Sequence, residues 1–156
     1  MRKQRSKSRF SHRVVAALVG VAAGLAELGG FALPAKAASL TIAEQFAMHQ
    51  IGKPYEWGAS GLGAYDCSGL TYRAWQTAGV TIPRTAEDQY WAGSHVPLAQ
   101  LQPGDLVFWG QNTSDIYHVG LYVGGNQVVN ATHAGGSVVV MGMFSWGSPL
   151  PLGVRP

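Results

Sequence analysis

The chain contains a single cysteine, Cys67, in the stretch AYDCSGL, and its setting favours a reactive thiol. Asp66 is a preferred helix N-cap residue, and apolar residues follow at helical spacing, so Cys67 is predicted to begin a helix. A helix N-terminus favours the thiolate, which is the nucleophilic form of cysteine. One cysteine forms no intramolecular disulfide, and no CxxC pair or His/Cys cluster indicates a zinc site. An intermolecular disulfide and an inert core cysteine are the alternatives.

A nucleophilic cysteine needs a base, and His118 is the best placed of the histidines. The stretch YHVGLYV alternates, which predicts a strand with His118 on one face and the apolar residues Val119 and Leu121 on the other. VGGNQ is typical of a hairpin turn, so the returning strand is expected to bring Asn130 next to His118. An amide there would hold the imidazole by its second nitrogen. His49, His95 and His133 are interpreted as solvated.

The elements that must position these residues are helices first and strands afterwards. Helices are predicted over 41–51, with Thr41 as cap, over 67–78, and after Thr85. The first of these is expected to place Ile42, Phe46, Ala47 and Ile51 near one helical face. Strands are predicted in GDLVFWG, YHVGLYVGG, NQVVNATH and SVVVMGMF, with a last one in LGVRP. This order predicts an α+β domain.

The first 37 residues have the order of a secretory signal peptide: a basic segment, an apolar segment and the small-residue sequence AKA. Cleavage is predicted after Ala37, which leaves one domain over 38–156; the alternative is a retained membrane anchor, against which Glu27 and the Ala/Gly bias argue. Residues 38–156 carry four Lys+Arg and seven Asp+Glu, a net charge of −3. The basic pI of 9.2 therefore belongs to the leader and does not indicate nucleic-acid binding.

Four stretches together resemble the NlpC/P60 family of bacterial cell-wall cysteine peptidases: PYEWGASGLGAYDCSGL, IPRTAEDQ, LQPGDLVFW and HVGLYVGGNQVVNA. They follow one another in the family's order, and the resemblance extends from about residue 43 to residue 156. It implies a papain-like fold, in which N-terminal helices, one carrying the nucleophilic cysteine at its start, pack on a small antiparallel β-sheet that carries the histidine.

Carried over by motif, the resemblance makes Cys67 the nucleophile, His118 the general base and Asn130 the orienting residue, at a position where many members have histidine. Tyr55 matches an active-site tyrosine, with packing in an aromatic loop as its alternative role. Backbone N–H groups at the start of the Cys67 helix, including that of Ser68, are candidates for the oxyanion hole.

Three charged residues, Arg84, Asp66 and Asp105, are also interpreted from their positions in the sequence. Arg84 resembles a recurrent family arginine that would meet a substrate carboxylate; a plain ion pair with Glu87 or Asp88 is the alternative. Asp66 is interpreted as a helix cap and Asp105 as structural.

The implied function is a secreted peptidoglycan endopeptidase, extracellular or at the cell wall, that hydrolyses stem peptides, most often between D-γ-glutamate and the diamino acid. No cofactor, metal, nucleic-acid partner or stable membrane anchor is expected, and the protein is expected to be a monomer. The alternatives are an N-acetylmuramoyl-L-alanine amidase of the related Cys/His type and a non-catalytic wall-binding protein.

Overall fold

The computed structural model describes residues 34–61 and 63–156, so the predicted signal peptide lies almost entirely outside the described residues. The helices are α1 (Ala35–Met48), α2 (Cys67–Thr77), α3 (Ala86–Trp91) and the short 3-10 helix η1 (Leu98–Gln100). The strands are β1 (Ser60–Gly61), β2 (Ala64–Tyr65), β3 (Ser94–Pro97), β4 (Leu106–Asn112), β5 (Asp115–Gly124), β6 (Gln127–Ala131), β7 (Val138–Gly142) and β8 (Leu152–Arg155). In these described stretches, no helix has the length and apolar character needed to cross a membrane.

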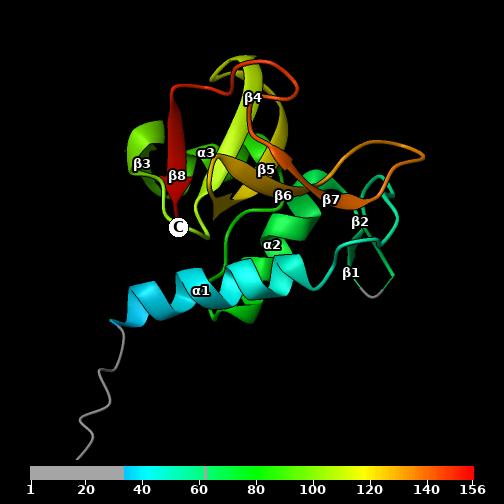
Figure 1. Ribbon diagram of the computed structural model, residues 1–156, viewed down its shortest axis with the longest axis horizontal. Helices are drawn as coiled ribbons and strands as arrows, with labels where there is room; N and C mark the ends of the chain where they lie inside the picture. The colour runs from blue at the N-terminus through cyan, green and yellow to red at the C-terminus, as the bar shows by residue number, and fades with distance from the viewer. Residues whose placement is uncertain (1–33, 62) are drawn as a thin grey trace, which may run out of the picture. The chain divides into compact units, whose positions relative to one another are not determined.

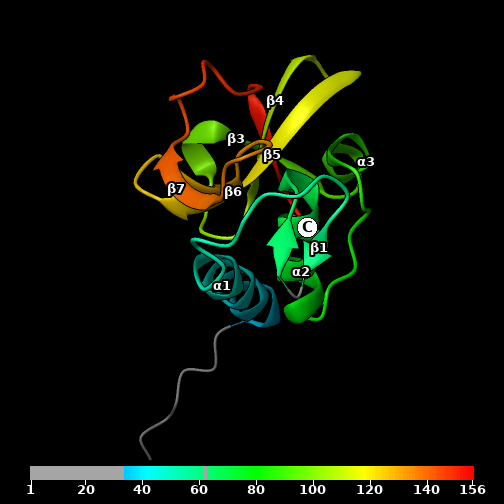
Figure 2. The ribbon, with the colours of Figure 1, turned by 90° about the vertical axis from the view of Figure 1, so that its right-hand side faces the viewer.

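The main sheet is antiparallel, with strand order β3-β8-β4-β5-β6-β7, and α1 and α2 lie together on one side of it (Figure 1, Figure 2). The principal core lies between these layers, where Leu70 and Trp75 of α2 belong to the same buried cluster as Phe108, Val119 and Leu121 of the sheet. β1 and β2 pair separately in the loop before α2. The predicted α+β class, with the cysteine at the start of a helix, is confirmed.

Helix α1 differs from its prediction at its start, at its end and in its buried face. It begins at Ala35, so Thr41 is no cap; its hydroxyl donates to the carbonyl of Ala37 within the helix. Leu40, Ala43 and Ala47 are its buried residues, whereas Ile42 is 42% exposed. The predicted end at residue 51 was also wrong, because the helix ends at Met48 and Ile51 lies beyond it, 46% exposed. The small alanine side chains allow close packing against the neighbouring helix.

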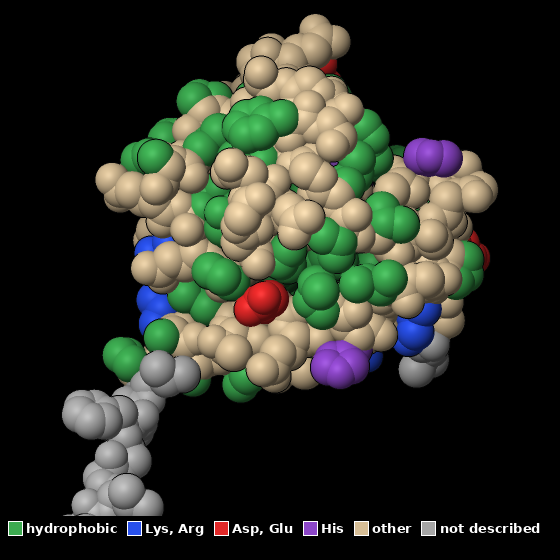
Figure 3. Space-filling model, viewed as in Figure 1, with side chains coloured by type: hydrophobic (Ala, Val, Ile, Leu, Met, Phe, Trp, Pro, Cys, Tyr) green, Lys and Arg blue, Asp and Glu red, His purple; other side chains and the backbone are tan. Residues whose placement is uncertain are grey.

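Charged side chains are sparse on the face drawn in Figure 3.

The strand face that carries His118 is also buried, which the alternating pattern did not predict. A second apolar cluster of Val107, Trp109, Val128 and Met143 covers this side of the sheet. Trp109 of β4 lies directly opposite His118 in the ladder. His118 is therefore 6% exposed rather than facing solvent.

The β5–β6 hairpin sets the distance between His118 and Asn130. Gly124, Gly125 and Asn126 all have positive φ (91°, 59° and 58°), which suits the tight turn that the sequence VGGNQ predicted. The register pairs Leu121 with Val129 and Tyr122 with Val128. His118 and Asn130 consequently share one face of the sheet as diagonal neighbours.

Candidate active site

The start of helix α2 holds Cys67 in place through its N-cap. The Asp66 carboxylate accepts a hydrogen bond from the Gly69 N–H at 2.6 Å, and its other oxygen accepts one from the Gly58 N–H at 2.9 Å. The Asp66 N–H in turn donates to the carbonyl of Ala59 at 2.9 Å. A Cβ at residue 69 would collide with that same carbonyl, so only glycine fits there. This accounts for the glycine of the DCSGL motif.

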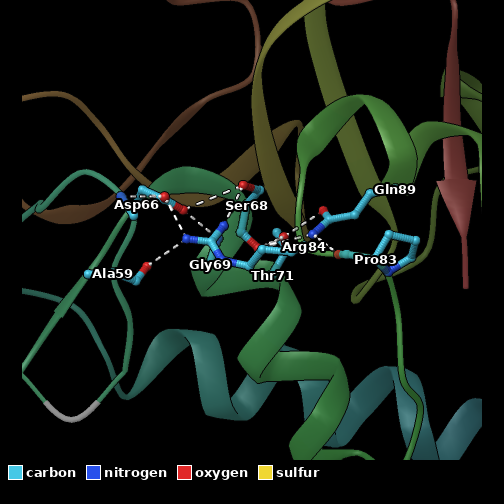
Figure 4. Close-up of polar contacts among 9 residues, drawn as sticks. Ala59, Asp66, Ser68, Gly69, Thr71, Pro83, Arg84 and Gln89 are labelled. Carbon is cyan, nitrogen blue, oxygen red and sulfur yellow. Dashed lines mark hydrogen bonds and ion pairs between the residues drawn. The ribbon is translucent and has the colours of Figure 1, made fainter.

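Arg84 joins this cap from the segment before α3, as Figure 4 shows. Its guanidinium forms an ion pair with Asp66 at 2.6 Å and donates to the Ser68 hydroxyl at 2.9 Å and to the Ala59 carbonyl at 3.3 Å. The predicted ion-pair partners, Glu87 and Asp88, were wrong: Asp66 takes that place, because the chain brings residue 84 to the first turn of α2. Asp105 is structural as predicted, since its buried carboxylate binds the guanidinium of Arg155.

Gln89 of α3 is a buried contact to the same helix turn that sequence reasoning missed. Its amide nitrogen donates to the carbonyls of Ser68 at 3.0 Å and Pro83 at 2.8 Å, and its oxygen accepts from the Thr71 hydroxyl at 2.7 Å (Figure 4). Each polar atom of this 1%-exposed amide is therefore satisfied. A glutamine in the polar stretch TAEDQ carries no signal of burial, so spacing alone could not identify it.

The Cys67 thiol lies where α2 meets strand β5. Burial raises the pKa of the thiol, and the Asp66 carboxylate acts in the same direction; the backbone N–H groups of Val119, Ser68 and Cys67 itself oppose them. The resting side chain is therefore a neutral thiol. The N–H groups at the helix start favour the thiolate, as expected, but desolvation outweighs them.

His118 and Asn130 form the contact that the hairpin predicted. His118 Nε2 lies 3.1 Å from Asn130 Oδ1, and both side chains are buried. Because an amide oxygen only accepts, Nε2 carries the proton and Nδ1 is left as a proton acceptor. Burial lowers the pKa of His118 from 6.5 to about 4, against the opposing effect of the Asn130 hydrogen bond. The imidazole is thus neutral and able to take a proton at neutral pH.

We expect the free energy of unfolding to increase as the pH rises from about 4 to 6.5. In this window the unfolded chain binds a proton at His118 and the native chain does not, so acid favours unfolding by roughly 3 kcal/mol in total. Denaturant titrations at a series of pH values measure this slope. His118→Gln provides the control and should have a flatter profile. Equal profiles for the two proteins would contradict a buried neutral imidazole.

Tyr55 and an open cleft complete the surroundings of Cys67. Tyr55 and Cys67 both pack, partly buried, against the main core cluster. Burial raises the pKa of Tyr55, Cys67 and Asp66 act in the same direction, and Arg84 opposes them. The cleft has a volume of about 720 Å³, and Cys67, Trp57 and Tyr117 are among the residues that line it. His118 does not line this cleft. It lies beside Val119, whose N–H faces the thiol.

The other histidines lie outside this arrangement, as predicted: His49, His95 and His133 are all exposed. Within residues 34–61 and 63–156, no group of three or more His, Cys, Asp and Glu side chains is arranged to hold a metal ion.

Comparisons with known proteins agree with this fold. The family model described as the NlpC/P60 family matches residues 52–148. The chain belongs to the NlpC/P60 family. It is 44% identical over 89 residues to a probable endopeptidase p60 of Listeria seeligeri, which covers 57% of this chain and 17% of that protein. It is 40% identical over 108 residues to a probable endopeptidase of Mycobacterium bovis, covering 69% and 27% respectively.

Solved structures are similar as well. The peptidoglycan hydrolase RipB of Mycobacterium tuberculosis superposes with a TM-score of 0.69 at 34% identity, over 79% of this chain and 68% of that one. The P60 domain of an antigen from Mycobacterium avium subspecies paratuberculosis gives 0.67 at 32% identity, over 77% and 96%. The family resemblance and the papain-like fold are confirmed. The chain spans only 17% to 27% of the length of the curated relatives described above.

Proposed function

We propose that this protein is a secreted peptidoglycan endopeptidase that cleaves stem peptides by thiol catalysis. The observation that carries the proposal is the placement of one cysteine, at a helix start in an open cleft, beside the strand whose neutral histidine is held by an amide. Relatives named as probable endopeptidases and a structural neighbour named as a peptidoglycan hydrolase support the substrate class.

In the proposed reaction, Cys67 Sγ attacks the scissile carbonyl while His118 Nδ1 takes the thiol proton. The backbone N–H groups at the start of α2 stabilise the developing oxyanion, and the Tyr55 hydroxyl is proposed to assist them. The proton then passes to the leaving amine as the C–N bond breaks and a thioester forms. A water molecule gives its proton to His118 and hydrolyses the thioester, and the proton returns to the sulfur.

Asn130 orients the imidazole throughout these steps. The buried Nε2–H···Oδ1 hydrogen bond selects the tautomer in which Nδ1 accepts, and it stabilises the imidazolium that forms during attack. Arg84 and Ser68 hold the first turn of α2 through Asp66. The side of the Arg84 guanidinium that lines the cleft is the proposed contact for a substrate carboxylate.

The scissile bond is proposed to be the D-γ-glutamyl–diamino acid bond, as the family resemblance implies. Mass spectrometry of purified peptidoglycan digested by the full chain tests this. Endopeptidase action yields fragments that end in D-glutamate and partners with a new amine on the diamino acid. Whole stem peptides that begin with L-alanine would instead show an amidase. Binding without any new product would show a non-catalytic wall protein.

Export is a separate proposal, based on the order of basic, apolar and small residues in the first 37 positions. We expect the secreted protein to begin at Ala38, which N-terminal sequencing would establish. Recovery only from membranes, with Met1 or Arg2 at the start, would contradict this.

A further inference from the structure

A tryptophan from a distant loop covers the imidazole of His118. The ring centroids of Trp146 and His118 are 4.7 Å apart and nearly perpendicular, at 71°. On another side Trp109 of β4 lies 5.5 Å from the imidazole, and the two indoles are 6.3 Å apart. Trp146 is 40% exposed, whereas His118 and Trp109 are 6% and 2% exposed. Of these three rings, Trp146 is therefore the one that reaches the solvent-exposed surface.

The connection between β7 and β8 is built to hold Trp146 in this place. Before Trp146 in the chain, Met143 is buried, and its N–H donates to the carbonyl of Asn126 in the β5–β6 turn at 2.8 Å. After Trp146 in the chain, the Leu150 N–H donates to the backbone carbonyl of Phe108 in β4 at 2.8 Å. Gly147, directly after the tryptophan, has a φ of 101°, which turns the chain back in a conformation that other residues rarely adopt. Both ends of the loop are thus fixed to the sheet.

We propose that Trp146 is a positioning residue for His118, an inference that rests on the proposed function. Water beside the imidazole would compete for Nε2–H and for the Asn130 oxygen, and would loosen the hydrogen bond that selects the tautomer. An indole in that place excludes water and offers no strong acceptor of its own. Trp109 also packs against the imidazole, but it is 2% exposed within the sheet's own apolar cluster and does not reach the surface as Trp146 does.

The side chains packed around the imidazole are uncharged, so the pKa of His118 reports on its burial. Trp109 of β4, Asn130 of β6 and Trp146 of the β7–β8 connection carry no charge, and the pKa of His118 is set by burial and by Asn130. The helices packed against β5 carry Cys67, Tyr72 and Arg73 on α2 and Glu87 and Asp88 on α3, and none of them contributes to the pKa shift of His118. A Cys67→Ser background removes the thiol from the measurement.

The first test is an NMR titration of His118 in the full chain carrying Cys67→Ser. Trp146→Ala admits water to the imidazole, so the pKa of His118 should rise from about 4 toward 6.5. Trp146→Leu, which keeps some apolar cover, should give a smaller rise. Trp91→Ala is the matched control, because this indole is 60% exposed on α3 and its ring neighbours are Tyr90 and His95 rather than His118. An unchanged pKa in the folded Trp146 variants would overturn the proposal.

The second test uses the same substitutions in the active protein. Trp146→Ala is expected to lower kcat about ten- to a hundred-fold with little change in KM, because the base is misaligned but the cleft is intact. Trp91→Ala should keep the parent kcat. A parent kcat in Trp146→Ala would overturn the positioning role even if the pKa had risen. A parent chain that cleaves no peptidoglycan would refute the proposed function alone, since the NMR titration requires no turnover.

Discussion

Replacing Cys67 by serine is expected to reduce peptidoglycan cleavage by at least about a thousand-fold while leaving the fold unchanged. The substitution exchanges one atom in a side chain that packs against the core, so the structure has no reason to change. A serine hydroxyl is far less acidic than a thiol. His118, whose pKa is lowered to about 4, is a weak base with an uncharged orienting partner and cannot activate an alcohol effectively.

Muropeptide release by the purified parent and Cys67→Ser proteins measures this effect, and circular dichroism verifies that both are folded. The Cys67→Ser protein should still bind the wall polymer, because the cleft keeps its shape and its other lining residues. Equal release by the two proteins would show that Cys67 is not the nucleophile, and the proposed enzyme class would then be wrong.

Asn130→Ala is expected to lower kcat by about ten- to a thousand-fold, with a much smaller effect on KM. The amide is fully buried, it holds His118 at 3.1 Å, and it does not line the cleft, so its loss should affect proton transfer more than binding. Asn130→His should retain substantial activity, because the family resemblance places histidine at this position in many members.

The two Asn130 variants also test whether the effect is local. A loss in Asn130→Ala as complete as that in Cys67→Ser, together with an altered circular dichroism spectrum, would indicate a collapsed fold. Parent rates in a folded Asn130→Ala protein would show that the imidazole needs no orienting amide. That result would remove Asn130 from the proposed mechanism.

Local patterns predicted the elements that carry the site. The Asp66 cap, the start of α2 at Cys67 and the Thr85 cap of α3 follow from the hydrogen-bonding preferences of single residues, and each is present. The strands β4 to β8 were predicted from alternation and from β-branched residues. β1 and β2, of two residues each, and the mostly exposed edge strand β3 are too short or too polar to give such a pattern.

Contacts between segments that are distant in the chain could not be predicted from the sequence. The ion pair of Arg84 with Asp66, the burial of Gln89 and the contact of Trp146 with His118 each join residues at least 18 positions apart. Ile42 and Ile51 were placed on one face of the first helix because periodicity identifies an apolar face without showing where the helix ends or which residues the rest of the fold covers. The neutral resting state of Cys67 likewise follows from burial, which only the packed fold determines.

Trapping of the covalent intermediate tests the central claim most directly. The parent protein is mixed with a purified muropeptide and quenched in acid within one turnover, and its peptides are mapped by mass spectrometry. Thiol catalysis predicts that the peptide containing Cys67 gains the mass of the acyl fragment on the N-terminal side of the scissile bond, while His118→Gln gains little. Turnover of the muropeptide with no such increment on the Cys67 peptide at any quench time would contradict the proposal.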